Sequence, residues 1–328
     1  MTLLHVSGLS VRFRTEDNPV QALSDVSFAL EEREILAIVG ESGCGKSVTA
    51  MSILGLLPST AAISGRIALE GRDLLTLPRK ELRSIRGKEL SMIFQEPMTS
   101  LNPVFTVGRQ VGEVLRHHEG LSRRAARDRA IELLDLVGIP APQRRVDEYP
   151  HQLSGGMRQR VMIAMAVSCD PKVLIADEPT TALDVTIQAG ILDLMRDLRD
   201  KLGTAILLIT HDLGVVADVA ERVIVMYAGR KVEEATAEEL FEHPQHPYTM
   251  GLLAAVPRLR EQPNGERDRL AEIPGMVPSL SAPPSHCPFA PRCSRADELT
   301  LSELPELRDV RPGHAVACFH PGDERTYS

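Results

Sequence analysis

Apolar residues alternate with polar ones near the start of the chain, and this pattern predicts the strands of a small antiparallel sheet. The alternation runs from Leu4 to Leu30, and a further stretch of the same kind lies at Ser64–Gly71. Later segments are short and mostly apolar, which is typical of strands that are buried on both faces. These segments are Ile35–Val39, Glu89–Phe94, Val173–Ala176 and Ala205–Ile209.

Segments with helical periodicity lie between the buried strands, at Ser47–Leu57, Val107–Val137 and Ile187–Lys201. An alternation of buried strands and helices predicts an α/β fold with a mostly parallel, doubly wound sheet. Proline then becomes frequent, because 11 of the 23 prolines lie between Pro257 and the C-terminus. This density predicts an irregular C-terminal extension without long helices.

The composition narrows the classes of function. The chain has 328 residues, of which 43% are hydrophobic and 25% charged, as in a globular protein of two structural units. No apolar run approaches the ~18 residues of a membrane span, and no signal peptide is visible, so we expect a cytosolic protein. A net charge of −8 argues against a nucleic-acid partner, and five cysteines argue against a disulfide framework. The arginine-rich segment Ser122–Arg129 is interpreted as a solvated helix face.

The segment Gly40-Glu41-Ser42-Gly43-Cys44-Gly45-Lys46-Ser47 has the spacing G-x-x-x-x-G-K-S between a predicted strand and a predicted helix. Its glycines allow successive N–H groups to face a phosphate, and the helix N-terminus adds partial positive charge. Lys46 can reach the β- and γ-phosphates of a nucleotide, and the Ser47 hydroxyl can bind Mg²⁺. Because Cys44 lies at this helix N-terminus, we expect its thiol pKa to be lowered and its alkylation to block activity. The predicted nucleotide-binding residues here are Gly40, Ser42, Gly43, Cys44, Gly45, Lys46 and Ser47.

Two adjacent carboxylates, Asp177 and Glu178, end the predicted strand Val173–Ala176. Catalytic groups collect at the carboxyl ends of parallel strands, and two acids allow a division of labour. Asp177 can hold Mg²⁺, and Glu178 can accept a proton from a water that attacks the γ-phosphate.

A second loop, Leu153-Ser154-Gly155-Gly156, precedes another predicted helix. Ser154 suits the N-cap position, and the glycines permit a close backbone approach. This helix start is either a second anion site or only a capped helix end, and the spacing does not decide between them.

Taken in order, these segments resemble the ATP-binding cassette (ABC) ATPases, over roughly residues 1–257. A histidine, His211, stands beside Asp212 where that family has one. The resemblance implies an ABC ATPase core with a small antiparallel β subdomain and an inserted helical subdomain at about residues 97–158. Residues 258–328 form the extension. ATP and Mg²⁺ are the implied cofactors.

The resemblance also implies roles for individual residues. Phe13 matches the aromatic residue that stacks on adenine, and Gln95 matches the glutamine that senses Mg²⁺ and the attacking water. Ser154 and Gly156 match residues that touch the γ-phosphate held by a second ATPase subunit. Asp184 lies where the family has a loop that crosses the dimer interface. His211 matches the histidine that contacts the γ-phosphate. Met157 and Thr181 depart from the common family residues, glutamine and serine, without removing an expected ligand.

Three stretches narrow the resemblance to ATPases of bacterial oligopeptide, dipeptide and nickel importers: residues 95–103, 246–249 and 252–257. The resemblance implies a peripheral subunit at the cytoplasmic face of the membrane. Its implied partners are two permease subunits that dock after Gln95, an extracytoplasmic solute-binding protein and a second ATPase, which we expect to be a paralogue. The alternatives are a nickel importer and a soluble ABC ATPase that does not transport; the single cassette and the lack of sustained heptads disfavour the second.

Three cysteines in the extension, Cys287, Cys293 and Cys318, raise the question of a metal cluster. Some members of the importer subgroup hold an iron–sulfur cluster with four cysteines, the usual ligand set of a [4Fe–4S] cluster. Here Thr300 stands about where the remaining cysteine would fall. The three thiols are therefore either incomplete cluster ligands or structural residues.

Overall fold

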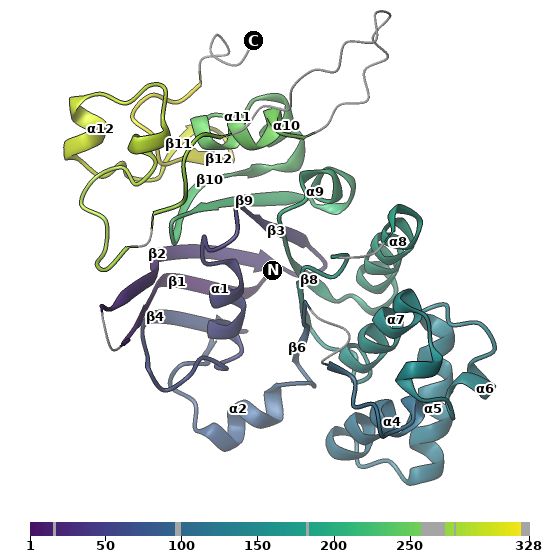
Figure 1. Ribbon diagram of the computed structural model, residues 1–328. Coiled ribbons are helices and arrows are strands. Elements are labelled where there is room, and N and C mark those ends of the chain that lie inside the picture. Colours follow the sequence, from purple (N-terminus) through teal and green to yellow (C-terminus); the bar gives the residue numbers. More distant parts are fainter. Residues whose placement is uncertain (16–17, 96–99, 182–183, 257–272, 279, 323–328) are drawn as a thin grey trace, which may run out of the picture. The chain divides into compact units, whose positions relative to one another are not determined.

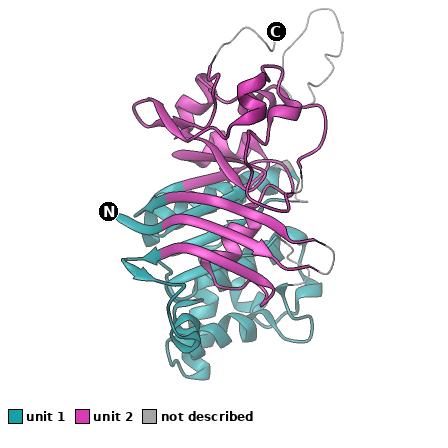
Figure 2. Ribbon diagram, turned by 90° about the vertical axis from the view of Figure 1, so that its left-hand side faces the viewer, with its two compact units in different colours: residues 1–5, 29–35, 68–209 teal, residues 6–28, 36–67, 210–328 magenta. Residues whose placement is uncertain are grey.

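The computed structural model describes residues 1–328 except 16–17, 96–99, 182–183, 257–272, 279 and 323–328. These residues form two compact units, which Figure 2 distinguishes by colour. Unit 1 consists of residues 1–5, 29–35 and 68–209, and unit 2 of residues 6–28, 36–67 and 210–328. The domain boundary predicted at residue 257 lies outside the described residues, so that division stays a prediction.

Parallel strands form the core of unit 1. Strands β6 (Leu90–Ile93), β7 (Val173–Asp177) and β8 (Ala205–Thr210) are neighbours, with Ile93 opposite Ala176 and Asp177 opposite Ile209. All residues of β7 and β8 are buried, which explains why these segments are apolar throughout. The predicted buried strands are thereby confirmed, and β7 delivers Asp177 to its carboxyl end.

The helices described in unit 1 lie in the last of its segments, residues 68–209, and α4, α5, α6 and α7 gather in one group (Figure 1). The predicted helical stretch Val107–Val137 is two helices, because Gly120 adopts a positive φ of 68° and Ser122 caps a new helix. The helices are α2 (Arg79–Ile85), α4 (Val107–His118), α5 (Arg123–Leu136), α6 (Pro142–Arg145), α7 (Gly155–Ala166) and α8 (Val185–Leu202), with the 3₁₀ helix η1 (Pro150–Gln152).

Unit 2 contains a mixed set of strands in the order β11-β12-β10-β9-β3. Strand β3 (Ile35–Val39) pairs in parallel with β9 (Arg222–Tyr227), and the remaining pairs are antiparallel. The other strands are β10 (Arg230–Thr236), β11 (Arg308–Arg311) and β12 (His314–Val316). The helices are α1 (Lys46–Ile53), α9 (Leu213–Val219), α10 (Ala237–Glu242), α11 (Pro247–Ala254) and α12 (Glu298–Ser302), with the 3₁₀ helix η2 (Ala290–Arg292).

A second sheet has the strand order β2-β1-β4-β5, which agrees with the alternating pattern at the start of the chain. Its strands are β1 (Thr2–Phe13), β2 (Val20–Glu31), β4 (Ala61–Leu69) and β5 (Arg72–Asp73).

None of the helices in the described part of the chain combines the length and the apolar character of a membrane span.

The C-terminal extension is less irregular than its prolines predict, because β12 pairs with β10. A buried carboxylate, Glu233, stabilises this junction. It accepts hydrogen bonds from the N–H groups of Gln245 (2.6 Å) and His246 (3.0 Å) and from Nε2 of His314 (2.7 Å). Burial of a carboxylate is tolerable when its oxygens are paired in this way. The extension therefore belongs to the core of unit 2.

Candidate functional site

The predicted site residues fall into two groups. Unit 1 holds Gln95, Asp177, Glu178, Ser154, Gly156 and Asp184, and unit 2 holds Phe13, the loop Gly40–Ser47 and His211. Each group is a local structure with its own geometry.

The loop Gly40–Ser47 connects β3 to α1, the strand–loop–helix context that the sequence predicts. Its three glycines all adopt positive φ angles: 148° at Gly40, 82° at Gly43 and 104° at Gly45. A Cβ atom on Gly40 would lie 2.3 Å from the Met226 carbonyl oxygen. The loop therefore needs glycine both for its backbone angles and for its close approach to β9.

Lys46 is 6% exposed, and its ammonium group turns back onto the loop. It donates hydrogen bonds to the carbonyl oxygens of Gly40 (2.6 Å) and Glu41 (3.1 Å). Ser47, the second residue of α1, is exposed. The loop thus presents exposed residues Ser42 and Gly43 beside a helix N-terminus and one ammonium group, as an anion site requires.

Cys44 corrects a prediction made from the sequence. The helix N-terminus was expected to lower the pKa of its thiol, but the residue is fully buried, and burial raises that pKa despite the nearby Lys46. Desolvation of the thiolate outweighs the attraction of a positive charge here. Cys44 therefore packs beneath the loop, and burial together with the raised pKa predicts a slowly reacting thiol.

Glu178 lies directly after β7 in an uncommon backbone conformation, with φ of 49°. Its Oε2 accepts hydrogen bonds from Nε2 of Gln95 (2.7 Å) and from the hydroxyl of Thr181 (2.9 Å). Its N–H donates to the carbonyl of Ile209 (2.8 Å). Residues in such left-handed conformations cluster at functional sites, where the surrounding structure holds them.

Gln95 and Glu178 are 83 residues apart, so their contact is a tertiary one that joins two predicted site residues. In the sequence, Thr181 stands out only because the family commonly has serine there. Its hydrogen bond to Glu178 has no sequence signal and is visible only in the structure. Asp177 is 5% exposed at the end of β7, where a carboxylate can bind Mg²⁺.

The loop before α7 is built as the sequence predicts, since Ser154 caps the helix by accepting a hydrogen bond from the N–H of Met157 (3.3 Å). A Cβ atom on Gly156 would lie 2.8 Å from Cγ2 of Ile187, so glycine permits contact between α7 and α8. Asp184 caps α8 through the N–H of Ile187 (3.0 Å). Its neighbours Ala182 and Leu183 lie outside the described residues.

A buried side chain, Gln159, links α7 to the end of β7. Its Nε2 donates to the carbonyl of Pro179 (2.7 Å), immediately after Glu178, and the residue is 2% exposed. The sequence contained no signal for this contact, because glutamine on a helix is usually a surface residue. The contact ties the capped loop to the strand end that carries Asp177 and Glu178, within unit 1.

Two further predicted residues lie at the edges of unit 2. Phe13 is half-buried at the end of β1. His211 is exposed and directly follows β8, and Asp212 caps α9 by accepting from the N–H of Gly214 (2.8 Å). Their roles toward adenine and the γ-phosphate stay predictions.

The segment 246–248 forms hydrogen bonds that connect it to the loop Gly40–Ser47. His246 accepts the N–H of Tyr248 at Nδ1 (3.0 Å), and burial lowers the pKa of His246 to about 4, which keeps the ring neutral. The Tyr248 hydroxyl then accepts a hydrogen bond from the N–H of Glu41 in the phosphate loop (2.8 Å). This segment therefore supports the loop from the C-terminal side of the chain.

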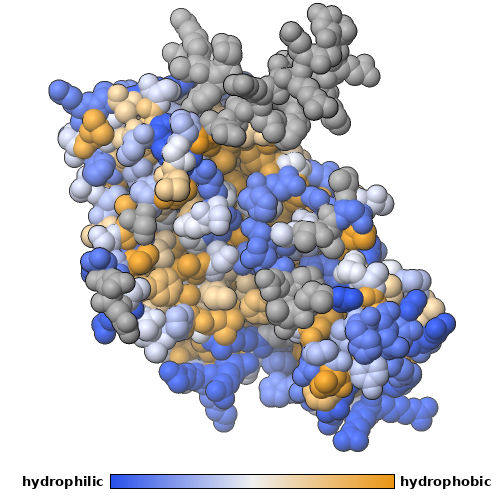
Figure 3. Space-filling view, in the orientation of Figure 1, coloured by the Kyte–Doolittle hydropathy of each residue, from blue (hydrophilic) through white to orange (hydrophobic). Residues whose placement is uncertain are grey.

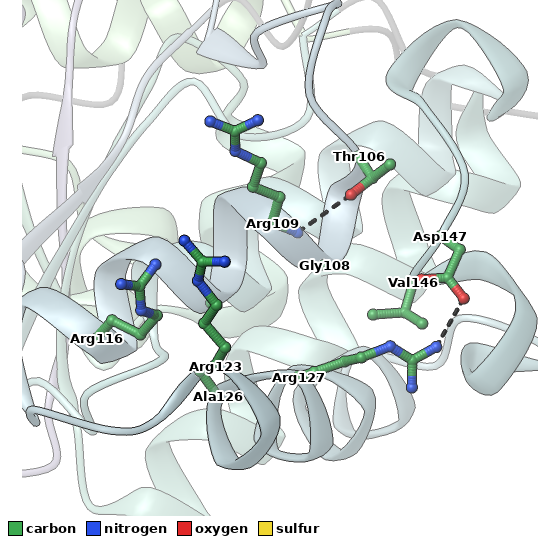
Figure 4. Close-up of a pocket in the computed structure, with 10 residues that line it drawn as sticks. Thr106, Gly108, Arg109, Arg116, Arg123, Ala126, Arg127, Val146 and Asp147 are labelled. Carbon is green, nitrogen blue, oxygen red and sulfur yellow. Dashed lines mark hydrogen bonds and ion pairs between the residues drawn. The ribbon is translucent and has the colours of Figure 1, made fainter.

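A positively charged hollow of about 450 Å³ lies between α4 and α5 in unit 1 (Figure 4). The side chains of Arg109, Arg116 and Arg123 extend to one side of it, whereas Arg127 turns to Asp147 in an ion pair of 2.6 Å. Arg116 and Arg123 have no ion pair with any other residue that the structure describes. The surface over α5 and α6 is largely hydrophilic (Figure 3), and all residues of Ser122–Arg129 except Ala126 and Arg129 are exposed, as expected for a solvated helix face.

The three C-terminal cysteines do line one cavity, together with Thr300, but its volume is only about 10 Å³. The Thr300 hydroxyl donates to the carbonyl of Asp297 (2.8 Å) and accepts its N–H (2.8 Å), as a capping residue. Burial raises the pKa of Cys287, Cys293 and Cys318, the last to about 11. Within the described ranges, no three His, Cys, Asp or Glu side chains are placed to hold a metal ion. These residues do not fit a [4Fe–4S] cluster.

Comparisons with known proteins identify the family of the chain. Residues 23–181 match the family described as ABC transporter, and residues 232–298 match the oligopeptide/dipeptide transporter C-terminal region. Among solved structures, a dimeric post-hydrolysis state of the ATP-binding cassette MJ0796 bound to ADP and Pi is similar, with a TM-score of 0.65 and 29% identity. The match covers 71% of this chain and 98% of that one.

Two curated relatives match nearly the whole chain. A probable peptide ABC transporter ATP-binding protein, y4tR of Sinorhizobium fredii, is 53% identical over 98% of this chain and 96% of its own length. The oligopeptide transport ATP-binding protein OppD of Bacillus subtilis is 54% identical over 97% of this chain and 89% of its own. The chain therefore belongs to the ABC transporter family, as an ATP-hydrolysing subunit that carries the oligopeptide/dipeptide transporter C-terminal region.

Proposed function

We propose that this chain powers the import of di- or oligopeptides across the cytoplasmic membrane, bound to the cytoplasmic face of its permeases. The observation that carries the proposal is the matched C-terminal region at residues 232–298, which is described as that of oligopeptide/dipeptide transporters. The relatives y4tR and OppD, named for peptide and oligopeptide transport, support the same class of solute. Transport of nickel is the alternative that the experiment below separates.

Hydrolysis is assigned to the strand end in unit 1. Glu178 accepts the proton of the water that attacks the γ-phosphate, and the hydrogen bonds from Gln95 and Thr181 orient its carboxylate. Asp177 in unit 1 would be a ligand of Mg²⁺, as would the Ser47 hydroxyl in unit 2, and the ion would supply positive charge to the phosphates. The loop Gly40–Ser47 supplies the N–H groups and ammonium that bind the phosphate chain.

The ATPase acts as a dimer, and we propose a paralogue as the second subunit. Ser154 is exposed at the N-terminus of α7, where it can meet the γ-phosphate of ATP on that partner. Asp184 is also exposed, as a residue at a dimer interface must be before assembly. ATP bound by two subunits favours the closed dimer, and hydrolysis removes that preference.

A cytoplasmic helix of the permease docks in the hollow between α4 and α5. The hollow follows Gln95 along the chain, and its arginines predict carboxylates on the docking helix. Arg123 also lies in the first turn of α5, a turn without acidic residues, where a cation is unfavourable in isolation. An acidic partner segment would offset that cost.

The test is affinity capture of tagged Glu178→Gln from solubilised native membranes in the presence of ATP, followed by mass spectrometry. Two permeases, a second ATPase and a peptide-binding protein are expected. A nickel-binding protein in place of a peptide-binding one would correct the solute, and recovery from cytosol without permeases would contradict the transporter assignment.

A matched pair of variants tests the docking hollow. Arg123→Glu in the Glu178→Gln background should lose the permeases but keep the second ATPase. Arg124→Glu, one residue along but outside the hollow, should retain both. Equal capture by the two variants would remove the hollow from the permease contact.

We propose that Cys287, Cys293 and Cys318 are packed thiols, because their cavity and Thr300 leave no room for a cluster. Purification without oxygen should yield a protein free of iron and acid-labile sulfide. Stoichiometric iron, lost in Cys293→Ala, would overturn this assignment.

A further inference from the structure

We infer that Arg292, in the C-terminal region, is a positioning residue that holds the phosphate loop in its nucleotide-binding shape through Glu41. The inference rests on the assignment of Gly40–Ser47 as the nucleotide loop, and it gives the C-terminal region a role in ATP binding. Arg292 and Glu41 both belong to unit 2 and are 251 residues apart in sequence.

The Arg292 guanidinium is saturated with hydrogen bonds. Its NH1 and NH2 groups donate to Oε2 (2.6 Å) and Oε1 (3.0 Å) of Glu41, a bidentate pair. The remaining donors reach the carbonyls of Pro274 (2.8 Å) and Ile273 (3.1 Å) and the hydroxyl of Tyr227 (3.4 Å). An arginine has five N–H groups, and five acceptors surround this one, so its position is specified on every side.

Glu41 is held at three chemically different points. Its side chain binds Arg292, its N–H donates to the Tyr248 hydroxyl (2.8 Å), and its carbonyl accepts from the Lys46 ammonium (3.1 Å). The last contact involves the residue that is predicted to bind the β- and γ-phosphates. A shift of Glu41 therefore displaces the backbone that positions Lys46.

The segment that carries Arg292 is itself fixed. Arg292 ends η2, which follows Phe289, and the Phe289 ring packs against Tyr227 (5.2 Å) and Tyr248 (5.5 Å) between ring centroids. The Arg292 side chain is 4% exposed, and pairing with Glu41 raises its pKa, so it stays charged. A buried, bidentate arginine pair fixes geometry where an exposed pair contributes little.

A second ion pair joins the C-terminal extension to α10 without touching the loop. Arg311 pairs with Glu239 at the same distance, 2.6 Å, with side chains 47% and 29% exposed and no contact to the loop. This pair is a matched control for the loss of an arginine in the same region.

The experiment measures the affinity of the full-length chain for a fluorescent ATP analogue in Arg292→Gln, Glu41→Gln, the double variant and Arg311→Gln. Loss of the pair should raise Kd about tenfold, equivalent to about 1.4 kcal/mol. The double variant should match the single ones, since they break one contact. Arg311→Gln should stay within about twofold of the parent.

Hydrogen exchange supplies the readout that a general loss of stability would not reproduce. In Arg292→Gln the amides of residues 40–46 should exchange faster, while those of β9 keep their protection. If Arg292→Gln fails to fold, Glu41→Gln breaks the same pair from the loop side, where the carboxylate is 31% exposed. Unchanged Kd in both variants, or fully additive effects, would overturn the inference.

Lys46→Ala separates this inference from the assignment of the loop. If Lys46→Ala binds the analogue as well as the parent, the loop assignment fails and the role of Arg292 fails with it. If Lys46→Ala loses binding and the Arg292→Gln and Glu41→Gln variants do not, only the inference about Arg292 is wrong.

Discussion

Glu178 in unit 1 and Glu41 in unit 2 are both carboxylates that follow a buried strand, but their partners differ. The donors to Glu178 include two neutral groups, the Gln95 amide and the Thr181 hydroxyl. Glu41 receives a bidentate guanidinium that occupies both of its oxygens. Neutral donors orient a carboxylate and leave its charge available for a proton, whereas a paired arginine offsets that charge and fixes the backbone. The environment of an acid, rather than its place at a strand end, separates a reacting group from a structural one.

The strongest test of this comparison is Glu178→Gln. The amide keeps the shape but cannot accept a proton, so ATP turnover should fall about 10³-fold while nucleotide binding persists. Turnover of the membrane complex and binding of an ATP analogue are the two measurements. Glu41→Gln is the matched control: it should weaken binding and retain turnover at saturating ATP. Equal losses of turnover in the two variants would break the distinction.

Gly45→Ala tests how tightly the backbone of the loop Gly40–Ser47 is held. Gly45 has φ of 104°, and a Cβ atom would lie 2.6 Å from Leu23 and 2.9 Å from the Ala22 carbonyl. The clash and the strained φ together should cost about 2 kcal/mol in the free energy of unfolding, measured with denaturant.

Gly43→Ala separates clash from strain. Its φ is 82°, but no atom outside its immediate neighbours lies within 4 Å of the added Cβ. The cost should be about 1 kcal/mol, from backbone strain alone. A larger loss for Gly43→Ala than for Gly45→Ala would contradict the packing described for the loop.

Thr181→Ala tests the neutral support of Glu178 and should have a smaller effect. Loss of one hydroxyl donor is worth about 1 kcal/mol, so turnover should fall about fivefold with little change in nucleotide affinity. Thr181→Ser keeps the donor and should restore the parent rate. A change in affinity rather than turnover would place Thr181 in binding instead.

The smallest expected effect concerns Cys44. Since burial raises its thiol pKa, little thiolate is present near pH 7 and the sulfur is inaccessible. Alkylation of the folded chain, followed by mass spectrometry, should label Cys44 at least about 100-fold more slowly than in urea. The rate should increase as pH rises toward the raised pKa. Rapid labelling at pH 7 would restore the reactive thiol that the sequence predicts.

Much of the catalytic region could be predicted from local sequence. The glycines and lysine of Gly40–Ser47, the cap at Ser154 and the acids after β7 are specified within a few consecutive residues. Such segments encode their own backbone geometry through φ preferences, capping and strand burial, so a linear pattern is sufficient. The strands and helices of both units follow the predicted periodicity for the same reason.

Other features depended on residues far apart in the chain. Pairing of β12 with β10, the contact of Arg292 with Glu41 and the donors around Glu178 join segments that no local pattern connects. The many prolines led to the prediction of an irregular C-terminal extension, because they restrict the backbone locally. They carry no information on whether the segments between them pair with strands elsewhere, as β12 does with β10. Cys44 is another example. Its position at a helix N-terminus beside Lys46 favours a low thiol pKa, but the atoms packed around it bury the thiol. Desolvation then raises the pKa by more than the positive charge lowers it. Sequence by itself determined the chemistry available to this protein; the tertiary structure decided which partners hold each group, because hydrogen bonding and burial act between residues that only folding brings together.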